Sequence, residues 1–158
     1  MVCYKPLNCR NNEKVKIYLC RVAGISVAPT SCELETSDNG KLDGFWHLER
    51  VDTLATGKSC DLSGQLLFWS VHMKLLNVSD KNYKLRSAFF RFEHANGTLR
   101  LYEPHENDRM NADPAIEDIS LIAPFGVNSL DEKYSVDCLT GSEMVLRTEK
   151  LRLVFKRF

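Results

Sequence analysis

The sequence of 158 residues has few of the features that mark enzymes and nucleic-acid-binding proteins. It contains no G-x-S-x-G nucleophile motif, no P-loop and no dinucleotide-binding fingerprint, so no catalytic residues are expected. Its 21 basic and 21 acidic side chains balance, and no basic stripe follows the chain, which argues against nucleic acid as a partner. The hydrophobic fraction of 44% is that of an ordinary globular protein of one domain.

Metal-binding patterns are also missing from the sequence. The four histidines are scattered, and none has the His-x-His, His-x-x-x-His or Cys-x-x-Cys spacing that gathers zinc ligands. The acidic stretch 103–109 lacks the alternating oxygen ligands of a calcium loop. We therefore expect no metal, no cofactor and no enzymatic activity.

The first 31 residues have the composition of an export signal. Lys14 and Lys16 precede the mostly apolar run 17–28, and small residues follow it before Cys32, which is the order of a bacterial lipoprotein signal. The run is shorter than the roughly 20 apolar residues that span a bilayer. This pattern predicts a leader over residues 1–31, lipid attachment at Cys32, and a position on the periplasmic side of the cell envelope.

The alternative for this region is a disordered N-terminal tail of a cytosolic protein. Arg21 interrupts the apolar run, and Pro29 stands where a lipoprotein signal usually has a leucine-like residue. Residues 32–43 are polar and rich in turn formers, so we interpret them as a tether. The cysteines beyond it, Cys60 and Cys138, could form one disulfide, although we favour two separate thiols because disulfide geometry is strict.

From Gly44 onward, apolar and polar residues alternate, which indicates β-strands. Trp46 and Leu48 share one face of the first strand, and the turn-rich residues 54–65 predict a loop. Residues 66–76 predict one long strand with a fully apolar side, followed by a turn. That side comprises Leu67, Trp69, Val71, Met73 and Leu75.

The strongest local signal is Asn96-Gly97, because both residues tolerate the positive φ that a type I′ hairpin turn requires. A two-residue loop there places Glu93 opposite Arg100 and turns His94, opposite Leu99, toward the apolar face. A slip by one residue would exchange the two faces, so the pattern specifies its register. The apolar face of this hairpin comprises Phe90, Phe92, Leu99 and Leu101.

Alternation continues to the C-terminus in three short strands separated by turns. A turn centred on Thr148-Glu149 would place Leu146 opposite Leu151 and Met144 opposite Leu153. Each of these pairs is apolar, so this last hairpin also predicts one buried face.

Short strands without βαβ spacing predict an all-β fold, an antiparallel up-and-down β-barrel of about eight strands over residues 44–158. Residues 113–123 predict one short helix with Pro114 in its first turn, and a strand over 118–122 is the alternative.

A barrel of this size either fills with side chains or holds one small ligand, and the sequence leaves both alternatives open. An apolar pocket with few polar groups is the usual form of a ligand site. The residues that would line it are Trp69, Val71, Met73, Phe90, Phe92, His94, Leu99 and Leu101.

The stretch Gly44-Phe45-Trp46 resembles the Gly-x-Trp step that begins the first strand of lipocalin-type barrels. With the leader, the tether and the ending "MVLRTEKLRLVFKRF", the chain is similar to the lipocalin-like lipoproteins of Bacteroidetes bacteria. The resemblance implies a calycin-like barrel in which Gly44 permits a close backbone approach and Trp46 plugs the closed end. It also implies a basic residue of the last strand stacked on that indole, and Arg157 occupies this position.

These observations predict a non-enzymatic envelope lipoprotein that binds or presents a small hydrophobic ligand in its barrel. Its only link to the membrane would be the lipid anchor. The alternative is a protein–protein interaction module with a solid core, whose loops, especially residues 103–113, bind another envelope protein. An exposed apolar patch at the loop end would favour this alternative.

Overall fold

The structure is a computed structural model and describes residues 37–158. The predicted leader, the predicted anchor Cys32 and the first part of the tether lie outside the described residues. Among residues 37–158, no helix is long and apolar enough to cross a membrane.

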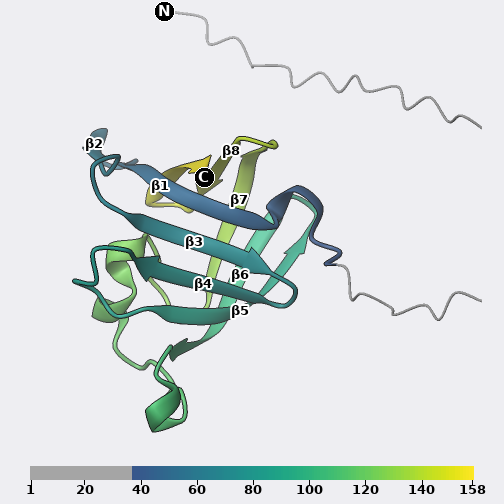
Figure 1. Cartoon of the computed structure of the whole chain (residues 1–158). Coiled ribbons are helices and arrows are strands. Elements are labelled where there is room, and N and C mark those ends of the chain that lie inside the picture. Colours follow the sequence, from purple (N-terminus) through teal and green to yellow (C-terminus); the bar gives the residue numbers. More distant parts are fainter. Residues whose placement is uncertain (1–36) are drawn as a thin grey trace, which may run out of the picture. The chain divides into compact units, whose positions relative to one another are not determined.

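The described residues form a single antiparallel sheet that closes on itself (Figure 1). β1 pairs with β3 on one side and with β9 on the other, so β1 and β3 to β9 make the predicted eight-stranded barrel. The additional short strand β2 pairs with the second half of β1 and extends from the barrel wall. The strands are β1 (Gly44–Thr53), β2 (Lys58–Asp61), β3 (Leu67–His72), β4 (Leu75–Asp80), β5 (Ala88–Ala95), β6 (Thr98–Glu106), β7 (Glu132–Leu139), β8 (Glu143–Arg147) and β9 (Leu151–Arg157).

The two ends of the barrel differ in how they are covered. The closed end is where β1 begins, after the short 3-10 turn η1 (Gly40–Leu42). The opposite end, which we call the mouth end, is where β3 begins and β4 ends, and the green β6–β7 connection lies against it in Figure 1. That connection contains three 3-10 turns, η2 (Arg109–Asn111), η3 (Ile119–Leu121) and η4 (Ala123–Phe125).

The hairpin at Asn96-Gly97 has the predicted turn and register. The φ angles of the two turn residues are 52° and 71°, both positive as the turn type requires. Glu93 lies opposite Arg100, and His94 lies opposite Leu99. The turn therefore aligns the ladder from Ala95 as far as Arg91, and a β-bulge then shifts the register so that Phe89 lies opposite His105.

The prediction of one long strand over residues 66–76 was wrong, because the chain reverses in its middle. Val71 of β3 lies opposite Leu76 of β4, and the turn between them has Met73 at a φ of 52°. Methionine rarely adopts this conformation, so no residue marks the turn in the sequence. Two predicted connecting segments also contain strands, since β2 lies within residues 54–65 and β4 continues through residues 77–80.

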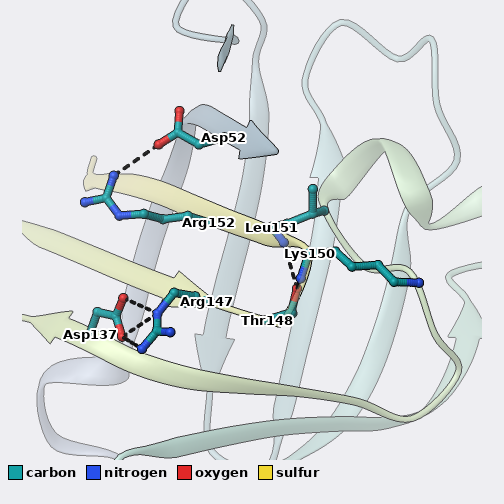
Figure 2. Close-up of polar contacts among 7 residues, drawn as sticks. All are labelled: Asp52, Asp137, Arg147, Thr148, Lys150, Leu151 and Arg152. Atoms are coloured by element: carbon teal, nitrogen blue, oxygen red, sulfur yellow. Dashed lines mark hydrogen bonds and ion pairs between the residues drawn. The ribbon is translucent and has the colours of Figure 1, made fainter. Parts of the chain in front are cut away.

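The register predicted for the last hairpin was two residues off. Leu146 lies opposite Leu153, and Met144 lies opposite Phe155. The cause is a wider loop, in which the Thr148 hydroxyl accepts hydrogen bonds from the backbone amides of Lys150 and Leu151 (Figure 2). A shift of two residues keeps every side chain on its face, so the buried side was still the predicted one.

The predicted helix over residues 113–123 is replaced by the separate 3-10 turns η3 and η4. Asp113 has a φ of 48°, in the left-handed region, and therefore does not act as a helix cap. The alternative strand over residues 118–122 is also absent from this part of the structure, where Asp118 accepts a hydrogen bond from the backbone amide of Ser120.

Candidate functional site

The closed end is built around Trp46, which is completely buried. Its indole Nε1 donates a hydrogen bond to the carbonyl of Leu42, at 2.8 Å. The guanidinium carbon of Arg157 lies 5.4 Å from the centre of the indole, a cation–π distance, and Nη2 of the same residue donates to the carbonyl of Asp43. This is the contact that the family resemblance implies, and its role is to close the barrel.

Gly44 is required here for two physical reasons. Its φ of 136° is one that side chains with a Cβ rarely adopt, and a Cβ at this position would lie 2.8 Å from Nη2 of Arg157. The family resemblance implied that another group packs closely against the backbone at Gly44, and in the structure this group is the side chain of Arg157.

Five of the eight residues proposed to line a ligand pocket are packed in the barrel core. A side chain beside a cavity that admits water would have accessible surface, and these have almost none. Their exposed fractions are 0% for Trp69, Phe90 and Leu99, 1% for Leu101 and 2% for Val71. In this structure a ligand could reach them only by displacing packed side chains.

The other three proposed pocket residues lie away from the fully buried interior. Phe92 is half-buried and packs against the edge of the core. Met73 is 38% exposed in the β3–β4 turn, which corrects its predicted place on the apolar strand face. His94 is exposed because β4 pairs with β5 only as far as Arg91, so the tip of the β5–β6 hairpin extends past its neighbour.

The mouth end is plugged by the β6–β7 connection, a role that the sequence pattern does not predict. Ile122, Phe125 and Val127 are completely buried, and Nε1 of Trp69 donates a hydrogen bond to the carbonyl of Phe125, at 3.1 Å. The apolar spacing in "LIAPFGV" was the available signal, but it does not say against what these residues pack.

Gly126 and Tyr134 hold this plug against the barrel. The Tyr134 hydroxyl donates to the carbonyl of Gly126, at 3.1 Å, and burial, followed by the charge of Glu132, raises the pKa of this phenol well above its ordinary value. It therefore remains a donor at neutral pH. A Cβ on Gly126, whose φ is 87°, would lie 2.9 Å from Cδ2 of Leu153.

Two hollows on the outer surface lie at opposite ends of the barrel. The hollow at the closed end, of about 600 Å³, is lined by Ser37, Asp38, Asn39, His72, Met73, Lys74 and Leu75. The hollow at the mouth end, of about 890 Å³, is lined by Thr53, Asn128, Ser129, Asp131, Glu132, Lys133, Thr148, Glu149, Lys150 and Leu151.

Exposed large hydrophobic side chains gather in the loops of the mouth end. Seven of the ten such residues within residues 37–158 lie there, and Met110 is exposed most, at 97%. The seven are Leu54, Leu66, Tyr83, Met110, Ile119, Leu121 and Leu130. The other three are Met73, Leu75 and Phe158.

Reactive groups are spread over the described part of the chain. Within it, no group of three or more His, Cys, Asp and Glu side chains is placed to hold a metal ion. No disulfide joins Cys60 to Cys138, because β2 and β7 are separated in the sheet by β1, β9 and β8.

The comparisons with known proteins concern the whole barrel. A solved structure of a lipocalin-like protein from Bacteroides uniformis aligns with a TM-score of 0.58 and 18% identity, covering 75% of this chain and 100% of that chain. A protein from Bacteroides eggerthii aligns with a TM-score of 0.55 and 17% identity, covering 73% of this chain and 98% of that chain. No curated protein matches the sequence. The family model of the lipocalin-like domain matches residues 26–158, so the chain belongs to the lipocalin-like domain family.

Proposed function

We propose that this protein is a non-enzymatic interaction module of the cell envelope, which binds a partner protein through the loops of its mouth end. The observation that carries the proposal is the packing of the barrel: the candidate pocket residues form a core, and Phe125 with its neighbours fills the mouth. The lipocalin-like fold is compatible with binding a small ligand or with binding a partner protein, and the packed interior favours a partner protein.

The mouth end supplies the surface for such an interaction. Its loops hold seven exposed large hydrophobic side chains, and a partner that covers this end would remove their apolar surface from water. Met110 and Tyr83, at 97% and 89% exposure, are the most accessible of them. Both would be buried by a partner seated on this end.

The envelope location and the membrane anchor rest on the leader pattern before Cys32. Expression in a bacterium supplied with labelled palmitate tests them. We expect the full chain to incorporate the label and Cys32→Ser to lose it. An unlabelled wild-type chain would contradict the anchor.

The interaction is tested by placing a photo-crosslinking amino acid at Met110 in cells, with Phe158, 85% exposed after β9 at the closed end, as the matched position. We expect a discrete protein adduct from position 110 and none from position 158. Protein adducts of equal yield at both positions would contradict a partner at the mouth end.

The second candidate, a small apolar ligand inside the barrel, is distinguished by native mass spectrometry of protein purified without detergent. We expect the mass of the folded polypeptide with no bound apolar molecule. A stoichiometric ligand would overturn the solid-core proposal and restore the ligand-binding hypothesis.

A further inference from the structure

The described chain begins at the closed end of the barrel, on one particular surface. The side-chain amide of Asn39 donates a hydrogen bond to the carbonyl of Met73, at 2.7 Å, and Ser37 lines the same hollow as Met73 and Leu75. Any segment that precedes Ser37 therefore leaves the barrel beside the β3–β4 turn.

The distance from Cys32 to the barrel is limited by covalent geometry. Ser37 is the fifth residue after Cys32, and a fully extended chain covers at most about 3.6 Å per residue, or about 18 Å over these five steps. The ten residues of β1, at the usual rise and barrel tilt, span about 25 Å along the barrel axis. The maximum length of this tether, measured from Ser37, is therefore shorter than the distance along the barrel from the closed end to the mouth end.

The surface next to this exit has the chemistry of a membrane contact. Met73 and Leu75 are 38% and 48% exposed, and the exposed Lys74 lies between them. A second exposed lysine, Lys41, lies in η1, which precedes β1 at the same end of the barrel. Apolar side chains interleaved with lysines suit the boundary between acyl chains and anionic headgroups. Asp38 is the acidic residue of the same hollow.

From these observations we infer that the closed end faces the membrane, with the tip Met73-Lys74-Leu75 in the headgroup region of an anionic phospholipid bilayer and the mouth end pointing away. The inference rests on the lipid attachment at Cys32 given under the proposed function. The contacts need not bind a membrane by themselves, because the anchor raises their local concentration. This orientation leaves the seven exposed hydrophobic side chains of the mouth end accessible to a partner.

The experiment uses the full chain with its five other cysteines replaced by serine and with Cys32 coupled to a maleimide phospholipid in anionic vesicles. A tryptophan is introduced as Leu75→Trp at the closed end or as Leu54→Trp at the mouth end, two leucines of similar exposure, 48% and 43%. Trp46 and Trp69 are fully buried and give the same background in both variants.

Brominated acyl chains in the vesicles then quench any tryptophan near the bilayer. We expect at least roughly twofold stronger quenching of the added fluorescence in Leu75→Trp than in Leu54→Trp. Equal quenching, stronger quenching in Leu54→Trp, or none in either variant would overturn the proposed orientation. Because the lipid is attached chemically, these outcomes are independent of the palmitate labelling that tests the natural anchor.

Discussion

At the scale of single residues, the Gly-x-Trp step has a complete physical explanation. Trp46 fills the closed end, Arg157 covers the indole, and Gly44 leaves the space through which the guanidinium reaches the carbonyl of Asp43. Arg157 connects the other two residues, because its guanidinium lies over the indole of Trp46 and would meet a Cβ at Gly44.

Gly44→Ala should lower the free energy of unfolding by about 1–3 kcal/mol, the usual range for a strained backbone conformation. Part of this loss comes from the clash with Arg157, so Arg157→Ala should be less destabilising in the Gly44→Ala background than in the wild type. Urea unfolding of the two single variants and the double variant measures this coupling. Gly57→Ala is the control, since Gly57 also has a positive φ but nothing within 4 Å of an added Cβ.

The carboxylate of Asp80 should make the stability of the fold depend on pH. Burial alone would raise the pKa of this carboxyl, but backbone amides of Asn82, Lys84 and Leu85 donate to it and hold the pKa below its ordinary value. Its contribution is therefore present above the unfolded pKa of about 3.9 and is lost as the pH falls through the lower folded pKa.

Asp80→Asn should lower the free energy of unfolding by about 1.5–3 kcal/mol at pH 7, the range for hydrogen bonds to a charged group. The variant should also lose less stability than the wild type between about pH 5 and about pH 2, as measured by urea titrations. Glu149→Gln, at an exposed carboxylate of the β8–β9 loop, is the control. Identical pH profiles for Asp80→Asn and wild type would contradict the argument.

At the scale of elements, the connection between β6 and β7 decides whether the barrel is hollow. It folds back so that Phe125 enters the mouth. There Trp69 donates a hydrogen bond to the carbonyl of Phe125, and Tyr134 donates one to the carbonyl of Gly126. A barrel of eight strands either fills with side chains or holds one small ligand, so this loop is the element that distinguishes a core from a pocket here.

Phe125→Ala should lower the free energy of unfolding by about 3–5 kcal/mol and leave an apolar cavity at the mouth. Apolar cavities of this kind stay dry and take up small apolar molecules. We expect an apolar fluorophore such as N-phenyl-1-naphthylamine to gain fluorescence with the folded variant and not with the wild type. Phe158→Ala, at an 85% exposed phenylalanine, should change neither property. A wild type that binds the dye equally well would show that the mouth is already open.

The turns between the strands show which turns can be predicted from residue type. Asn96-Gly97 was predicted with its register because both residues favour positive φ. Met73-Lys74 was missed because methionine adopts positive φ only when the strands on both sides impose it. The β8–β9 loop was misaligned because the Thr148 side chain extends the turn through hydrogen bonds that residue preferences do not encode.

At the scale of the whole molecule, the barrel depends on the seam between β1 and β9. Asp52 of β1 forms ion pairs with Arg152 across this seam and with Arg50 on its own strand, and it also accepts a hydrogen bond from Ser59 of β2 (Figure 2 shows the pair with Arg152). The carboxylate therefore links the first and last strands of the barrel.

Asp52→Asn should lower the free energy of unfolding by about 1 kcal/mol, as for partly exposed ion pairs, and the loss should shrink at high salt. It should also speed hydrogen exchange of the β9 amides that pair with β1. Asp137→Asn is the matched control, because the ion pair of Asp137 with Arg147, also drawn in Figure 2, joins β7 and β8, which are neighbours in sequence. Equal acceleration of β9 exchange in both variants would contradict a specific role at the seam.

The sequence by itself determined the all-β class, the Asn96-Gly97 hairpin and most of the buried faces, because alternation and turn preference act between residues that are close along the chain. The closure residues Gly44, Trp46 and Arg157 followed from the resemblance to lipocalin-type barrels. Only the tertiary structure decided that the interior is solid. That outcome depends on contacts between distant segments, such as the hydrogen bond from Trp69 to Phe125, 56 residues away. Hydrophobic patterning marks both residues as buried, but it does not specify whether they pack against each other or around a ligand.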